Sequence, residues 1–556
     1  MTDTQSPRIR RWRIEGTLTT DTPLHLGTGG VESWKELKGR EKGEEAKPPK
    51  VKAVVVDATG RPCLTPSGLK GAMQAWARAH LPDCLWGAED EKAPLKARDT
   101  LFGAAADPNG EAVGSRLEFL GGRLEFHYAP MEEPTDRAKS PVKLRNTHRN
   151  SQVDTGVRID RASGAALDRH LFFKEVVDPG ATFKVTLDLD VPPDAKDGGR
   201  DLVTLALALL EGFNPGTGDE VPRLALGAMT GRGHGRFTWA RSALKRLSDD
   251  DLAEWIGQGA PRTWEAALVD VPEGEATAIH NKATGWRQQA QVHPELICQL
   301  RLQFDHHFLL SEPSRVISDK EANKAQGGER TASLMPRVDH AGKPVLPASS
   351  IKGVLRARAE RILATLTDDE EPFGHRPGRG KQTADTNIRA QGLPSQRLFG
   401  AASWRASLGI DPFTLEGEAV TAHQELVAID RFTGGASGSS KFDIEAFDRP
   451  TFTGCLRLDL DPKRTSLEDV GLLVLVLRDL AEGDLTFGYG STKGYGGAEA
   501  TLSLKVTGDG GVLDLEGESP KDWIPWARLG ASTLAQPLRA AVDALREKHL
   551  ANGEAA

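Results

Sequence analysis

The sequence predicts an α+β protein made of two similar domains in tandem. The first observation behind this prediction is a repeat, because residues 157–164 (VRIDRASG) return as residues 427–434 (VAIDRFTG). The second is that other landmarks return in the same order around each copy. The third is that the same succession of strands and helices is predicted in both halves. The interval is far too long for a solenoid repeat, so two fused domains of one type are the favoured interpretation.

The other landmarks share one property, which is that each occurs once per half and in the same order. Five ordered matches of this kind, with the repeat itself included, make coincidence a poor explanation. The pairs are LTPSGLKG at 64–71 with LPASSIKG at 346–353, LFGAA at 101–105 and again at 398–402, ATFKVTLDL at 181–189 with PTFTGCLRL at 450–458, and the glycine clusters 227–235 and 488–497.

The first half reads as strand, helix, two strands, helix and strand. Alternating apolar residues predict the first strand at 12–18. Pro66 and Ser67 begin a helix that carries Leu69, Met73, Trp76 and Ala77 on one face. The remaining predicted elements are strands at 116–128 and 182–191, a helix at 201–212 and a strand near Phe237. This order is the ferredoxin-like βαββαβ pattern, with an insertion between the two middle strands.

The second half repeats this order. The predicted elements are a strand at 296–304, a helix at 349–366, a central strand at 451–460, a helix reaching Leu480 and a last strand at 496–504. Thr465 and Glu468 predict a capping box at the start of the second helix. The predicted domains are residues 1–245 and 294–506, joined by a connector at 246–293 and followed by a helical tail at 507–556.

Composition excludes several classes of protein. The chain has 556 residues, which is more than one hydrophobic core usually supports, and 27% of them are charged, as in soluble globular proteins. No apolar run is long enough for a membrane span or a signal peptide, and the four cysteines are scattered, so we expect free thiols and a cytoplasmic location. The net charge of −8 argues against nucleic-acid binding over the whole surface. A local basic face remains compatible, because residues 137–149 contain five cations and no acid.

Two repeated elements suggest phosphate binding. At the helix starts, Ser67 with Lys70 and Ser349 with Lys352 combine small residues, free backbone N–H groups and a cation. The glycine clusters place Arg232, His234 and Lys493 beside bare backbone. Neither cluster fits the P-loop pattern, so ATP binding is disfavoured. A loop packed against a polynucleotide and a plain tight turn between helix and strand are equally good interpretations of the clusters.

No catalytic triad or metal-ligand cluster stands out in the sequence. Acids follow the first strand of each half, among them Glu36 in the first and Asp319 in the second. Such an acid can bind a divalent metal or orient a 2′-hydroxyl, although solvated surface acids are the commoner case. The adjacent Asp160 and Arg161, which recur as Asp430 and Arg431, suggest either a local salt bridge or a shaped protrusion common to both domains.

Together these segments resemble the RAMP superfamily of CRISPR–Cas proteins, and specifically the backbone subunits of type III effector complexes. The resemblance rests on four pieces that appear twice: the end of the first strand (Leu24-His25-Leu26-Gly27, more loosely His307-Phe308-Leu309-Leu310), the Ser-x-x-Lys-Gly helix start, the Ile-Asp-Arg-x-Ser/Thr-Gly insertion and the late glycine loop. It covers nearly the whole chain except the connector and the tail.

The resemblance implies a fold and a role. Each domain would be a RRM-like palm that holds guide RNA by its backbone, with the Ile-Asp-Arg insertion as a thumb that wedges between guide and target. Sequence would then be read by base pairing with the guide rather than by side chains. The residues we expect to bind RNA are Ser67, Lys70, Arg145, Arg149, Arg158, Arg161, Arg232, His234, Ser349, Lys352, Arg356, Arg431 and Lys493.

The resemblance also implies a possible nuclease and a set of partners. Asp319 is the candidate catalytic and metal-binding residue for target cleavage with Mg²⁺ or Mn²⁺, and Glu36 is its counterpart in the first domain, where no aspartate occurs. The alternatives are a non-catalytic guide-binding scaffold and a guide-processing endoribonuclease. The expected partners are crRNA, target RNA, the large polymerase-like subunit, other RAMP backbone subunits and small subunits.

Overall fold

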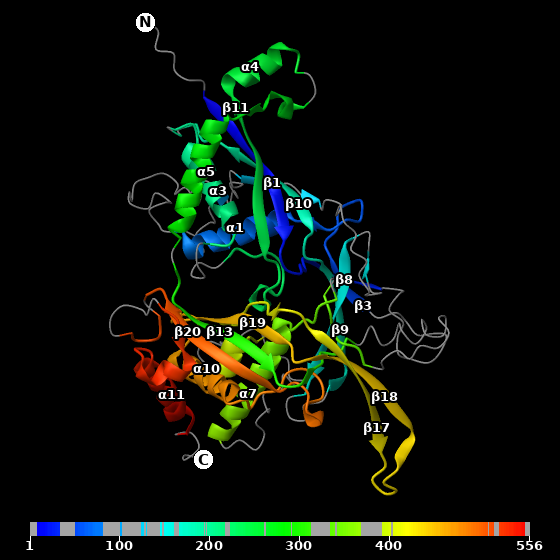
Figure 1. Ribbon diagram of the computed structural model, residues 1–556. Coiled ribbons are helices and arrows are strands. Elements are labelled where there is room, and N and C mark those ends of the chain that lie inside the picture. Colours follow the sequence, from blue (N-terminus) through cyan, green and yellow to red (C-terminus); the bar gives the residue numbers. More distant parts are fainter. Residues whose placement is uncertain are drawn as a thin grey trace.

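The computed structural model divides the chain into an upper and a lower half (Figure 1). The structure describes residues 8–33, 50–81, 101–102, 124–126, 129–130, 145–146, 149–160, 166–193, 195, 197–216, 223–260, 263–290, 292–312, 334–339, 342–367, 392–401, 404–509, 511–515 and 522–550.

The first half is built on an antiparallel sheet with the order β12-β11-β1-β10-β5. Its strands are β1 (Ile9–Thr20), β5 (Leu124–Phe126), β10 (Thr182–Asp190), β11 (Phe237–Ser248) and β12 (Val269–Asp270). The four strands from β11 to β5 have the order expected for a ferredoxin-like βαββαβ unit. The helices of this unit are α1 (Pro66–His80) and α3 (Arg200–Glu211).

Helix α1 forms where the sequence predicted it. The Thr65 hydroxyl accepts a hydrogen bond from Gly68 N at 3.2 Å, which satisfies one of the free donors of the first turn. Leu69, Met73, Trp76 and Ala77 are all buried, in the same cluster as β1 and α3. The predicted apolar face is therefore confirmed.

The second half repeats the sheet with the order β15-β19-β13-β20-β21. Its strands are β13 (Glu295–Phe304), β15 (Leu408–Ile410), β16 (Thr414–Glu416), β19 (Thr451–Asp459), β20 (Ala498–Thr507) and β21 (Ile524–Pro525), and its helices are α7 (Ala348–Thr367), α9 (Pro394–Phe399) and α10 (Leu467–Ala481). The buried residues of this half form a hydrophobic cluster separate from that of the first half. The predicted fold class, two tandem α+β domains, is confirmed.

A long hairpin leaves each half between the two middle strands, and we call it the thumb. The first thumb pairs β8 (Ser151–Ile159) with β9 (Ala166–Val177), and the second pairs β17 (Val420–Ile429) with β18 (Ala436–Asp448). In Figure 1 the second thumb projects beyond the body, while the first lies beside the second half. Short elements accompany the thumbs and palms: β2 (Gly27–Ser33), β3 (Lys50–Val54), β4 (Cys63–Leu64), β6 (Ala129–Pro130), β7 (Arg145–Asn146) and β14 (His307–Phe308).

The repeat extends into the connector and the tail, which the sequence analysis treated as separate segments. The connector contains α4 (Asp249–Gly257), the short helix η3 (Trp264–Ala267) and α5 (Glu273–Gln288), and the tail contains η5 (Trp526–Ala531) and α11 (Ala535–Leu550). Helix α5 packs on α3, and α11 packs on α10 in the same way. The α10–α11 contact is close, since a Cβ at Gly471 would lie 2.1 Å from the Ala541 carbonyl oxygen.

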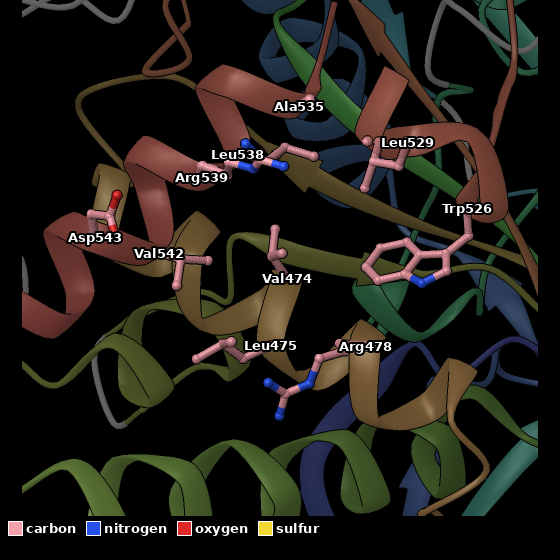
Figure 2. A pocket seen from close by; sticks show the side chains of 11 residues that line it. Val474, Leu475, Arg478, Trp526, Leu529, Ala535, Leu538, Arg539, Val542 and Asp543 are labelled. Carbon is pink, nitrogen blue, oxygen red and sulfur yellow. The ribbon is translucent and has the colours of Figure 1, made fainter. Parts of the chain in front are cut away.

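An open cavity of about 330 Å³ lies between α10 and the tail (Figure 2). Figure 2 shows Val474 and Leu475 of α10 facing Leu538 and Val542 of α11, with Trp526 at one end. The lining is mostly apolar, and the Arg478 guanidinium donates to Asp479 Oδ1 at 2.6 Å. Arg478 and Arg539 are the two cations of the lining, so the cavity lacks the longer series of cations that an RNA backbone needs.

The start of helix α10 differs from the prediction. The cap of α10 is shifted by one residue, because Ser466 is the N-cap and its backbone N–H donates to Asp469 Oδ2 at 2.9 Å. Glu468 instead forms an ion pair with Arg397, and Thr465 Oγ1 donates to the Asp459 carbonyl oxygen at 2.6 Å. The predicted capping box of Thr465 and Glu468 is therefore wrong.

The structure tests the predicted domain boundaries, the predicted strand at 116–128 and the cysteines only in part. Strand β11 runs to Ser248, past the expected domain end at residue 245, and the boundaries as a whole stay a prediction. Of the strand expected at 116–128, the described residues include β5 alone. Cys63, Cys298 and Cys455 are free thiols, and Cys84 lies outside the described residues.

Candidate nucleic-acid interface

The two glycine loops have the same geometry. Each contains one short helical turn, η2 (Thr230–Arg232) or η4 (Ser491–Lys493), between the second helix and the last strand. In the first loop Gly235 N donates to the Pro23 carbonyl oxygen at 3.0 Å, and in the second Gly496 N donates to that of His307 at 3.0 Å. This register makes Arg232 equivalent to Lys493, and His234 equivalent to Tyr495.

The last glycine of each loop is required by its conformation. Gly235 has φ of +71°, and a Cβ there would lie 1.8 Å from the Leu226 carbonyl oxygen. Gly496 has φ of +77°, and its Cβ would lie 2.0 Å from the Phe487 carbonyl oxygen. Both positions combine a left-handed backbone with close approach of a second chain segment. The loops are thus tight turns, and each carries a cation on its short helical turn.

The first glycine loop docks on the second half. Turn η2 packs against β15, and a Cβ at Gly233 would lie 2.4 Å from Pro412 Cδ. The Arg236 guanidinium forms an ion pair with Asp411, whose other oxygen accepts from Arg457 Nε at 3.4 Å. This contact fixes the first loop relative to the palm of the second half.

A second contact joins the base of the first thumb to the second half. Asp154 of β8 pairs with the Lys174 ammonium of β9 at 2.6 Å and also with the Arg337 guanidinium of the second half. Arg337 Nη1 donates in addition to the Thr155 carbonyl oxygen at 3.4 Å. Two ion-paired contacts therefore hold the halves together.

A series of cations crosses this junction, and we call it the cationic track: Lys52, Lys174, Arg232, Lys352 and Arg405. Burial and the nearby Arg232 and Lys52 lower the pKa of Lys174 to about 8, against the opposing effect of its pairing with Asp154. Burial, Arg232, Arg356 and Arg405 lower the pKa of Lys352 to about 8. Arg232 thus lies near cations of both halves.

Most cations of the track have no ion-pair partner among the residues that the structure describes. No carboxylate of this part forms an ion pair with Lys52, Arg232, Lys352 or Arg405, although Asp459 partly offsets the lowering of the Arg405 pKa. This is unusual in a chain of net charge −8, where arginines such as Arg13, Arg236, Arg358 and Arg397 are ion-paired. Adjacent cations without counter-charges repel one another. An anionic ligand would reduce this repulsion, which destabilises the ligand-free protein.

The model of the RAMP superfamily matches the chain at residues 17–238 and again at 255–499. The chain belongs to the RAMP superfamily. Its members are CRISPR-associated RNA-binding proteins that assemble with crRNA and other Cas subunits. No curated protein sequence matches the chain. Along the described part, no helix combines the length and apolar composition needed to span a bilayer.

The two RAMP palms differ in chemistry beside the thumb. His25, Lys174 and His234 of the first palm occupy the places of Leu309, Ile444 and Tyr495 in the second. The second set packs as a small apolar cluster. In the first, burial and the charges of Lys174, Arg232 and His25 lower the pKa of His234 to about 4, so its imidazole is neutral at pH 7. The polar palm is the one whose thumb base contacts the other half.

The helix-start residues of both RAMP halves lie at the surface or close to it. Ser67 and Ser349 are exposed, and Lys70 and Lys352 are half-buried. Arg356, one turn after Lys352, donates to Glu360 Oε1 at 2.9 Å and to the Gly400 carbonyl oxygen at 3.0 Å. Of these five predicted RNA-binding residues, the structure brings Lys352 and Arg356 into the vicinity of the track.

The other predicted RNA-binding cations differ in their surroundings. Lys493 is exposed, and its ammonium lies 3.2 Å from the Tyr489 hydroxyl. Arg149 is committed to carboxylates, because its Nη1 donates to Glu32 Oε2 at 3.0 Å and to the buried Glu175 Oε2 at 3.2 Å. Arg145 lies in β7, and Arg161 lies outside the described residues.

The thumbs of the RAMP halves present apolar side chains to solvent. Ile159 is 47% exposed and Phe172 is 46% exposed on the first thumb, while Ile429 is 63% exposed and Phe432 fully exposed on the second. Arg158 and Arg431 are exposed beside them. Asp430 accepts from the backbone N–H groups of Phe432 at 2.7 Å and Thr433 at 3.0 Å, so it shapes the tip through the backbone.

Sequence reasoning missed three members of the track. Lys52 and Lys174 lie on adjacent parallel strands, β3 and β9, and Arg405 precedes β15. None of them belongs to a repeated motif, since the first two are replaced by Leu334 and Ile444 in the second half. Only the folded arrangement brings them together, so the sequence carries no local signal for them.

The predicted catalytic residues Asp319 and Glu36 both lie outside the described residues. Among the described residues, the one group of three side chains able to hold a metal is Asp479, Glu482 and Asp484. Arg358 pairs with Asp479 at 2.5 Å and with Asp484 at 2.8 Å, so two of the three carboxylates are already ion-paired within the protein. The described residues therefore offer no fitting metal site at the interface, and the metal stays a prediction.

Proposed function

We propose that this chain is a double backbone subunit of a type III CRISPR interference complex, which holds guide crRNA across both halves and positions complementary target RNA. The observation that carries the proposal is the cationic track, which passes from the first half to the second and of which Lys174 alone has an ion pair among the described residues. Cations of this kind hold an RNA backbone while the bases stay free to pair.

The two thumbs support the positioning role. Each leaves its palm at the same point of the fold and ends in exposed apolar residues. Such side chains pack against the faces of bases, and each base stacked on an aromatic ring contributes about 1–3 kcal/mol. One thumb per half would then interrupt the guide–target duplex at two places.

The decisive test is the RNA affinity of a Lys352→Gln variant. We expect its affinity for single-stranded RNA to fall by about tenfold, and the slope of log K against log[salt] to decrease by about 1, because one phosphate contact is lost. Without RNA, the variant should be more stable than the parent below pH 8. The lowered pKa of Lys352 means that its charge destabilises the folded state there, and this penalty disappears as pH rises from about 8 toward the ordinary lysine value.

The matched control is Lys343→Gln, which removes an exposed lysine of the same half. Fluorescence anisotropy with a labelled RNA of mixed sequence measures the affinity, and thermal unfolding at several pH values measures the stability. If Lys352→Gln and Lys343→Gln bind RNA equally well, the proposed role of the track is wrong.

Target cleavage is the finer part of the proposal. Asp319, with a divalent metal, is the candidate that the family resemblance implies, whereas a scaffold without cleavage is the alternative. In the assembled complex, Asp319→Asn should abolish the cut opposite the second thumb while guide and target still bind. Gel analysis of end-labelled target RNA measures this cut. If cleavage at that place is undiminished, Asp319 is not the catalytic residue.

A further inference from the structure

The loop cation of one half and the helix lysine of the other half stand on elements that pack against the same strand. Turn η2, which carries Arg232, packs against β15, and so does helix α7, which carries Lys352. The two elements are far apart in the sequence and meet only because the halves are docked. Gly233 against Pro412 and the Arg236–Asp411 ion pair fix this arrangement.

The corresponding pairs within one half show no such electrostatic influence. Arg232, Arg356 and Arg405 act on the charge of Lys352, and Lys493 of the same half does not. Lys70 of the first half has its pKa lowered by burial alone, so no described cation adds to that effect, including Arg232 of its own half. The loop cation Arg232 therefore influences the helix lysine Lys352 across the junction.

We propose that Arg232 and Lys352 form one binding site for a single backbone phosphate of RNA, shared between the two halves. This inference rests on the proposed function and adds to it which residues act together. The guanidinium supplies paired donors for two phosphate oxygens, and the ammonium supplies a point charge. Neither cation has a carboxylate partner among the described residues, so both are available. Arg232 of the first half would then bind the RNA segment that the second half holds.

A double-mutant cycle tests this sharing with the full-length chain and a labelled single-stranded RNA of mixed sequence, long enough to cross both halves. Arg232→Gln and Lys352→Gln should each weaken binding by about tenfold. The double variant should be little weaker than either single variant, because the first substitution already removes the shared phosphate. The matched cycle combines Arg232→Gln with Lys70→Gln, and there the effects should multiply.

The outcomes of this cycle distinguish a failure of the shared site from a failure of the proposed function. If the Arg232 and Lys352 effects multiply, the two residues bind separate phosphates, and the shared site is overturned while the proposed function stands. The same holds if Arg232 couples to Lys70 instead. If no single variant weakens RNA binding, the proposed function fails and the shared site fails with it. Thermal unfolding of each variant shows that a loss of affinity is not a loss of fold.

Discussion

Replacing Arg397 by methionine is expected to lower the free energy of unfolding of the second half by about 3–5 kcal/mol. Arg397 is 4% exposed, and it lies between Asp469, which is fully buried, and Glu468, which is 5% exposed. Its Nε donates to Asp469 Oδ2 at 2.9 Å, and its Nη2 pairs with Glu468. Without the guanidinium, the buried Asp469 would lose its side-chain cation, and Glu468 would keep its contacts with Ser466, Lys548 and His549.

The control for this prediction is Arg10→Met, which breaks an exposed ion pair with Asp249. Because both partners of that pair are solvated, we expect this substitution to leave the unfolding midpoint almost unchanged. Urea unfolding followed by circular dichroism compares the two variants. Equal midpoints would mean that the Arg397 network contributes no more than a surface pair.

Gly235→Ala is expected to have the second large effect, a loss of about 3 kcal/mol in the free energy of unfolding together with weaker RNA binding. Alanine disfavours φ of +71°, and its Cβ would meet the Leu226 carbonyl oxygen at 1.8 Å, so the loop must move. Such a movement shifts Arg232 on the adjacent turn η2 and disturbs the docking of Gly233 on Pro412.

Gly231→Ala is the matched control in the same loop. Gly231 has an ordinary φ, and a Cβ there meets no heavy atom within 4 Å. It should therefore match the parent in thermal unfolding and in RNA affinity. A Gly235→Ala protein that also matches the parent would contradict the assignment of the loop as a conformationally required turn.

Much of the fold was predictable because its signals are local. Alternating apolar residues predicted a strand where β1 lies, and the apolar face of Leu69, Met73 and Trp76 predicted a helix where α1 lies. The cap of α10 was not predictable in detail, because Thr465 and Ser466 are adjacent hydroxyls and Glu468 and Asp469 adjacent acids. The distant Arg397 binds both acids, and that tertiary contact cannot be seen in the local pattern.

The candidate site was predictable only in part. Repetition pointed to Lys352 and Arg232 as separate cations of separate domains, and their proximity arises from docking that no motif encodes. Lys174 sits in a strand with no repeated counterpart of like charge, so nothing in the sequence distinguishes it from a surface lysine. Conversely, Arg149 stands in a run of cations, but the fold places it against Glu175 and Glu32.

The helix that covers each half bears on how the chain arose. Because α5 on α3 recurs as α11 on α10, the copied segment included this cover as well as the palm and thumb. The repeated unit is therefore larger than a palm with a thumb, since it brings its own covering helix. The two copies differ at the thumb base, which is apolar in the second half and charged in the first, where it contacts the other half.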